Sequence, residues 1–126
     1  MSNRHPIVVT SEDHDRLTRL LETHARRRDA GACAALEGEL ERARIVAPAE
    51  LPFDVVTMNS TVRFREADGP PQEIHLVYPH GADPARGHVS ILAPVASALL
   101  GLAVGESIDW PFPDGRIRRL HVDAVS

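Results

Sequence analysis

The chain has 126 residues, of which 43% are hydrophobic and 25% are charged, a composition typical of one small folded domain or of a domain with an appendage. Its net charge of −4 argues against a surface built to neutralise phosphates, so we expect a protein partner and no direct sequence-specific nucleic-acid binding. All 14 basic residues are arginines, which excludes Schiff-base lysine chemistry and a P-loop lysine.

Neither a membrane location nor a disulfide is expected. The apolar run near the N-terminus is short, and no run approaches the roughly 18 apolar residues that a spanning helix needs. The single cysteine, Cys33, has no second cysteine with which to form a disulfide or a zinc site. These observations predict a cytoplasmic protein.

The first third of the chain is expected to be helical. Proline is absent from residues 7–47, and Thr10 offers a hydroxyl cap that is followed by acids suited to a helix N-terminus. Residues 7–9 are expected to be extended just before this helix. The side chains that recur at helical spacing along it are those of Leu17, Leu20, Leu21 and His24.

A turn is expected at residues 29–31, directly after three arginines that suit a helix C-terminus. Beyond the turn, a three–four spacing typical of a seam between packed helices is formed by Cys33, Leu36, Leu40 and Ala43. The pattern predicts a short antiparallel helical hairpin, a coiled coil, over residues 1–47. Its tip would consist of Arg26, Arg27, Arg28 and Asp29.

The remainder, residues 48–126, is expected to form an α+β domain with an antiparallel sheet, joined to the hairpin by Val46 to Pro52. Alternating apolar residues and turn signals predict strands over 53–57, 61–66, 72–78, 87–92, 107–112 and 116–125. One short helix is expected over 94–100, because Pro94 suits its first position and Gly101 suits its end.

The sequence offers no catalytic or metal site. Its histidines form no HxH or HExxH pair and have no carboxylate at ligand spacing; they are His5, His14, His24, His75, His80, His88 and His121. Ser90, Ser97 and Ser107 lie outside any nucleophile elbow. We therefore expect no catalytic residue, no metal and no cofactor.

Two blocks of sequence carry a family resemblance. The stretch SILAPVASALLGLAVGESI, from Ser90 to Ile108, resembles the C-terminal signature of the Gre transcript-cleavage factors. The blocks DVVTMNS, from Asp54, and LVYP, from Leu76, are similar to the Rnk family, regulators of nucleoside diphosphate kinase and shorter relatives of the Gre factors. The resemblance implies an FKBP-like fold for the C-terminal domain and a protein that binds the RNA polymerase core.

The resemblance also implies a docking site. In Gre-type factors the segment at the matching helix start docks on a coiled coil at the rim of the polymerase secondary channel, which corresponds here to Ala93, Pro94 and Val95. Gre factors usually carry serine at the position of Ala93. Their hairpin tip holds acids that bind a catalytic magnesium ion, whereas this tip offers Asp29 alone beside three arginines.

The expected hairpin is also short, because a helix from residue 11 to residue 28 spans only about 27 Å. The resemblance therefore implies a transcription modulator that occupies the secondary channel and competes with Gre factors without catalysis of its own. Two alternatives stay open. One is a transcript-cleavage factor in which Asp29 completes a metal site with a polymerase group, and the other is an FKBP-like prolyl isomerase. No site for a link to nucleoside diphosphate kinase is visible in the sequence.

Overall fold

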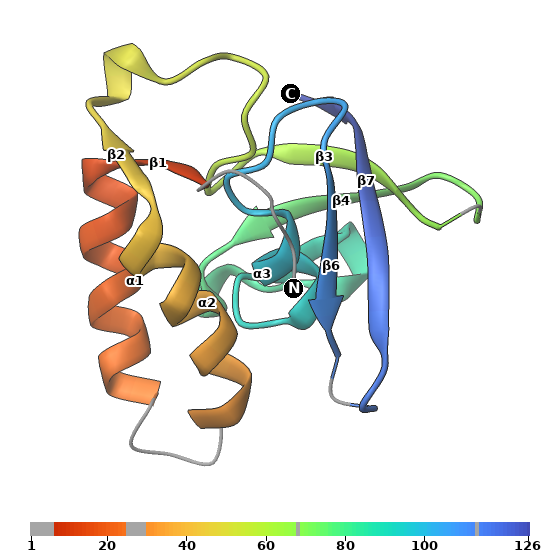
Figure 1. Ribbon diagram of the computed structural model, residues 1–126, viewed down its shortest axis with the longest axis horizontal. Helices are drawn as coiled ribbons and strands as arrows, with labels where there is room; N and C mark the ends of the chain where they lie inside the picture. Colours follow the sequence, from red (N-terminus) through yellow and green to blue (C-terminus); the bar gives the residue numbers. More distant parts are fainter. Residues whose placement is uncertain (1–6, 25–29, 68, 113) are drawn as a thin grey trace.

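The computed structural model describes residues 7–24, 30–67, 69–112 and 114–126, with the side chains of residues 24 and 30–35 left aside. Figure 1 shows two helices packed beside a curled sheet, with a short third helix between the two parts. The architecture is therefore α+β with a helical N-terminal part, as expected. In the described part of the chain, no helix is long and apolar enough to cross a bilayer.

The helical part consists of α1 (Ser11–His24) and α2 (Ala30–Arg42), which run side by side in opposite directions (Figure 1). The expected cap is present, because the hydroxyl of Thr10 accepts a hydrogen bond from the Asp13 backbone N–H at 3.1 Å. The predicted extended segment is β1 (Val8–Thr10), which pairs in parallel with β2 (Arg44–Val46). This pair closes the base of the two helices, and no pattern in the sequence predicts it.

The five-stranded sheet has the order β5-β4-β3-β7-β6. Its strands are β3 (Thr61–Glu66), β4 (Gln72–Val77), β5 (His88–Ser90), β6 (Ser107–Pro111) and β7 (Ile117–Val125). The expectation of an antiparallel sheet is wrong for one pair, because β4 and β5 run parallel. The connection between them contains the short 3-10 helices η2 (Pro79–Gly81) and η3 (Pro84–Arg86), which carry the chain back so that His88 pairs with His75 in the middle of β4.

The strand expected over residues 53–57 is also absent from the described fold. This segment follows the 3-10 helix η1 (Pro48–Glu50) and contributes only an isolated bridge between Val55 and Ala103. It ends in a tight turn, in which Asn59 adopts a left-handed φ of 69° and the Ser60 hydroxyl accepts a hydrogen bond from Thr57 N–H. The apolar residues at the centre of this segment pack into the core and do not form a strand pairing; Val56, for example, is fully buried.

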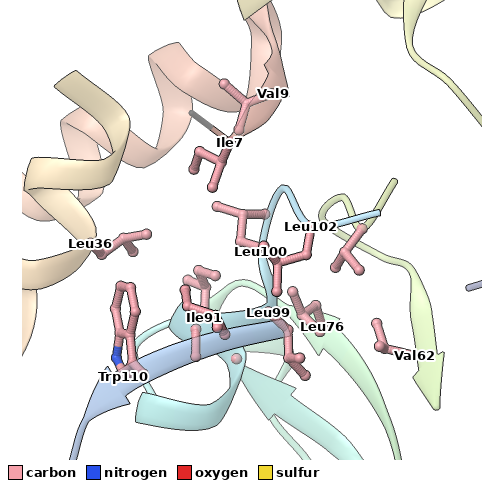
Figure 2. Packing of buried hydrophobic residues seen from close by; sticks show 14 of the residues in the cluster. Ile7, Val9, Leu36, Val62, Leu76, Ile91, Leu99, Leu100, Leu102 and Trp110 are labelled. Atoms are coloured by element: carbon pink, nitrogen blue, oxygen red, sulfur yellow. The ribbon is translucent and has the colours of Figure 1, made fainter. Parts of the chain in front are cut away.

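The third helix, α3 (Pro94–Leu99), lies between the sheet and the helical part and joins their apolar surfaces into one core. Leu17, Leu21, Leu36 and Leu40 of the first two helices belong to the same buried cluster as Leu100 and Trp110. Figure 2 shows Leu36 pointing toward Trp110, and Ile7 lying above Leu100. Each buried leucine contributes about 1.5–3 kcal/mol, so this packing fixes α1 and α2 to the sheet domain.

The close approach of Ile7 to Gly101 allows the shared core to be tested by substitution. Gly101 has a left-handed φ of 81°, and a Cβ atom at this position would overlap the Cβ of Ile7. Gly101→Ala is therefore expected to lower the free energy of unfolding by about 2–4 kcal/mol. Urea unfolding followed by circular dichroism measures the change.

Gly38→Ala is the matched control, because no atom lies within 4 Å of the added methyl group in α2. This substitution is expected to raise the free energy of unfolding by about 0.5–1 kcal/mol, since alanine has the higher helix propensity. Equal effects of the two substitutions would contradict the proposed contact between Ile7 and Gly101.

Candidate functional site

The start of α3 holds the three residues expected to dock on a partner. Ala93 precedes the helix with an extended backbone, and Pro94 occupies its first turn. Ala93, Pro94 and Val95 are half-buried, whereas the following residues of the helix are buried. The structure therefore brings the three residues together at the end of α3 that reaches the surface.

Hydrogen bonds fix the loop that leads into α3. The buried Ser97 hydroxyl donates to the Ile91 carbonyl at 2.6 Å, and the Ser90 hydroxyl accepts from Leu92 N–H at 3.1 Å. The Ser90 carbonyl also accepts from Ala93 N–H at 2.9 Å. Both serines therefore hold the backbone of the loop that leads into α3, which gives them a structural role.

The predicted hairpin tip, Arg26, Arg27, Arg28 and Asp29, lies outside the described residues. The structure describes the helices on either side of the tip: α1 ends at His24 and α2 begins at Ala30. The role assigned to the tip stays a prediction.

A polar cluster that the sequence analysis missed links α1 to the sheet domain. The Asp13 carboxylate accepts hydrogen bonds from the Met58 backbone N–H and from the Tyr78 hydroxyl, both at 3.4 Å. The Arg16 guanidinium lies over the Tyr78 ring, 4.5 Å from its centroid, and His80 stacks on the same ring with an interplanar angle of 4°. We call these four side chains the Tyr78 cluster.

Burial shifts both acidic groups of the Tyr78 cluster. It raises the pKa of Asp13, although the hydrogen bonds from Met58 and Tyr78 and the charge of Arg16 act to lower this pKa. Burial, with the nearby Asp13 charge, raises the pKa of Tyr78 to about 12. The neutral phenol is therefore the form that the folded protein favours.

The sequence gives little indication of the Tyr78 cluster because its members lie far apart in the chain. In the sequence, Asp13 resembles an ordinary acid in the first turn of a helix. Tyr78 resembles a residue that shares one face of a strand with Ile74 and Leu76. Both interpretations are compatible with the structure. The contact itself depends on how α1 packs against the sheet domain, which spacing does not reveal.

The described histidines are held by hydrogen bonds and ring contacts. His14 pairs with the Leu40 carbonyl at 3.1 Å, His75 with the Thr61 hydroxyl at 3.0 Å and His121 with the Ser107 hydroxyl at 2.8 Å. The ring of His88 lies 4.9 Å from that of His75. Among the residues that the structure describes, no group of three or more potential ligands could hold a metal ion.

Ser107, His121 and Asp123 lie together on the outer face of the sheet, although the sequence shows no triad order. The Asp123 carboxylate lies 3.8 Å from His121 Nε2, beyond hydrogen-bond distance. It instead accepts hydrogen bonds from the Arg65 guanidinium at 3.0–3.2 Å. This arrangement binds Asp123 to Arg65 and gives His121 no orienting carboxylate, so it lacks the geometry of a serine nucleophile.

Two family models together match almost the whole chain. The model described as Rnk N-terminus matches residues 5–46, and the model described as transcription elongation factor, GreA/GreB, C-term matches residues 47–126. The curated regulator of nucleoside diphosphate kinase from Escherichia coli (strain K12) is 43% identical over 123 residues, which cover 95% of this chain and 88% of that protein. The chain belongs to the Rnk family.

This Rnk-family chain is also similar to Gre-type proteins. Transcription elongation factor GreA from Novosphingobium aromaticivorans is 32% identical over 112 residues, covering 86% of the chain and 71% of that protein. A solved structure described as prokaryotic transcription elongation factor GreA/GreB from Nitrosomonas europaea is 47% identical, with a TM-score of 0.76. It covers 95% of this chain and 98% of its own. These relatives are named as a regulator and as elongation factors.

The Tyr78 cluster predicts a distinct alkaline transition. The chain has one tyrosine and no lysine, so Tyr78 is the only side chain whose ordinary pKa lies near 10. Because the folded state raises this pKa to about 12, the contribution of Tyr78 to stability is present below about pH 10 and is lost as the pH rises toward 12. Urea unfolding of this Rnk-family protein at pH values from about 9 to about 12, an interval that brackets the ordinary and the raised pKa of Tyr78, measures the loss of stability.

The Tyr78→Phe variant serves as the control, since it keeps the ring without the ionisable hydroxyl. Its stability is expected to change less over the same interval of pH. A phenolate absorbance that rises with a midpoint near the ordinary value of about 10 in the folded protein would contradict the assignment.

Proposed function

We propose that this protein is a transcription modulator that binds the RNA polymerase core, occupies its secondary channel and competes with Gre factors, with no catalysis of its own. The C-terminal domain, residues 48–126, would have the FKBP-like fold and would anchor the protein at the channel rim. The helical hairpin, residues 1–47, would enter the channel. The surface position of Ala93, Pro94 and Val95, in a domain that matches the GreA/GreB C-terminal family, is the observation that carries this proposal.

The local structure at α3 suits a docking element. The hydrogen bonds of Ser90 and Ser97 hold the loop, and proline restricts the backbone at the helix start. A surface that is already ordered loses little conformational entropy when a partner binds. Leu92 and Val95 pack against the core from this segment, so its position is set by the same residues that stabilise the domain.

Occupancy of the channel is favoured over transcript cleavage by the length and charge of the helical part. Even a helix that ran from Ser11 through Arg28, just before the expected turn, would span only about 27 Å. The sequence at the expected tip has three arginines and one aspartate, and magnesium usually needs one or two carboxylates that are not opposed by adjacent cations. A short, cationic tip is suited to exclude a longer factor from the channel.

The first prediction of this proposal concerns competition. Fluorescently labelled protein is expected to bind the polymerase core, and an unlabelled Gre factor is expected to displace it, because both would use the same site. Fluorescence anisotropy measures both steps. Stable binding that a saturating Gre factor leaves unchanged would contradict the shared site.

A cleavage assay on stalled transcription complexes distinguishes occupancy from catalysis. The wild-type protein is expected to leave the transcript intact and to inhibit cleavage by an added Gre factor. Cleavage by the protein alone, lost in Asp29→Ala, would instead support the alternative in which Asp29 completes a metal site.

The second prediction concerns the docking residues. Pro94→Ala is expected to weaken binding to the polymerase core about tenfold, since it alters a preordered part of the contact. Charge reversal at Arg26, Arg27 and Arg28 is expected to weaken binding without unfolding the protein. Circular dichroism checks the fold of each variant.

Pro84→Ala is a matched control for Pro94→Ala. Pro84 also begins a short helical turn, η3, and is exposed. Its substitution is expected to leave the affinity for the polymerase unchanged. A folded Pro94→Ala variant that binds as tightly as the control would remove α3 from the docking site.

A further inference from the structure

A cationic groove lies between α1 and the segment that follows β4. It is shallow and open to solvent, has a volume of about 470 Å³, and is lined by Arg16, Arg19, Leu20, Thr23, Tyr78, Pro79 and His80. We call it the Tyr78 groove. One wall therefore comes from the helical part of the chain and the other from the sheet domain.

The chemistry of the lining combines positive charge with apolar surface. Arg16 and Arg19 supply two guanidinium groups, while the half-buried Leu20 and the ring of Tyr78 pack against the core and supply apolar area. Among the described residues that line the groove there is no carboxylate. In a chain with a net charge of −4, this local sign is opposite to that of the whole molecule.

The walls of the groove are ordered before any partner binds. Arg16 is held over the Tyr78 ring, and the Tyr78 hydroxyl donates to Asp13, which in turn accepts from the Met58 backbone. Arginine is suited to such a site because its planar guanidinium can stack on a ring and still donate hydrogen bonds to a carboxylate.

These observations favour a peptide over a nucleic acid. Arg16 already lies over one face of the Tyr78 ring, and the His80 ring lies parallel to it with centroids 6.5 Å apart, so the ring is partly occupied as a stacking surface for a base. Two guanidinium groups are few for a site that follows a phosphate backbone. An apolar floor with carboxylate-binding groups at its edge instead matches a peptide that carries both acidic and apolar side chains.

A second groove on the other side of α1 has the opposite charge. It is lined by Glu22 of α1 and by Glu37 and Glu41 of α2, and it encloses about 460 Å³. An acidic segment would be repelled there and attracted to the Tyr78 groove. The two grooves together therefore select one side of α1 for an acidic partner.

We propose that the Tyr78 groove binds an acidic, partly apolar peptide segment of RNA polymerase, an inference that rests on the proposed function. The contact would add to the one made by α3 and would fix the rotation of the helical part around its own axis. Arg19 would bind a carboxylate of that segment, and Leu20 would contact its apolar side chains.

The test measures the affinity of labelled variants for the polymerase core by fluorescence anisotropy. Arg19→Glu is expected to weaken binding about tenfold, because it places a like charge opposite the acidic segment. Arg116→Glu is the matched control, since Arg116 is exposed in the turn between β6 and β7 and the substitution changes the net charge equally. The control is expected to bind like the wild-type protein.

Three outcomes would overturn the inference. If Arg19→Glu binds the core as tightly as Arg116→Glu while Pro94→Ala binds weakly, the proposed function stands and the Tyr78 groove is not part of the contact. If Arg19→Glu abolishes binding to a short labelled single-stranded RNA but keeps the affinity for the core, the groove binds nucleic acid. If the wild-type protein does not bind the core, both proposals fail.

Discussion

The packing of Leu36 against Trp110, and of Ile7 against Leu100 and Gly101, joins two parts of the chain that have different secondary structure. α3 lies at the centre of this packing, with its residues Ala96 to Leu99 buried. The shared core fixes where α1 meets the sheet domain, and this position in turn creates the Tyr78 groove. The core also leaves the start of α3 at the surface. Both candidate contact sites therefore depend on the same buried side chains.

Local patterns in the sequence predict most of the regular structure. The strand over residues 61–66 has the expected bounds, and the expected helix at Pro94 ends within one residue of the observed one. The cap at Thr10 is present because it depends only on residues three apart. Ala93, Pro94 and Val95, the proposed docking residues, lie together at the start of α3 because they are contiguous in the chain.

The features that the sequence does not predict depend on contacts between distant residues. β1 and β2 are each three residues long, too short for an alternating pattern to identify their parallel pairing. Apolar and polar residues alternate around Val56 as they do in a strand. In the structure the apolar residues of this segment pack into the core, and the segment does not pair as a strand. The contact between Asp13 and Tyr78 joins residues 65 positions apart, and nothing in their neighbours marks it.

The distribution of charge separates the Tyr78 groove from the outer face of the sheet. On that face, arginines and acids pair across strands, as in Arg63 with Glu73 at 3.8 Å and Arg119 with Asp109 at 3.6 Å. Such exposed pairs contribute little to stability, but they cancel the field that a charged partner would feel. The described lining of the Tyr78 groove has no carboxylate; Asp13 lies behind it, hydrogen-bonded to the Tyr78 hydroxyl and near Arg16, so Arg19 is the arginine whose charge is offered to a partner.

The parallel pairing of β1 with β2 has a mechanical consequence. The strand before α1 and the strand after α2 are held together, and the Val8 backbone N–H donates to the Gly101 carbonyl at 3.4 Å. The two helices are therefore tied together at one end, beside Gly101, which lies two residues after the end of α3 at Leu99. Because both helices are anchored at this point, a force on their far ends would be borne there, close to α3.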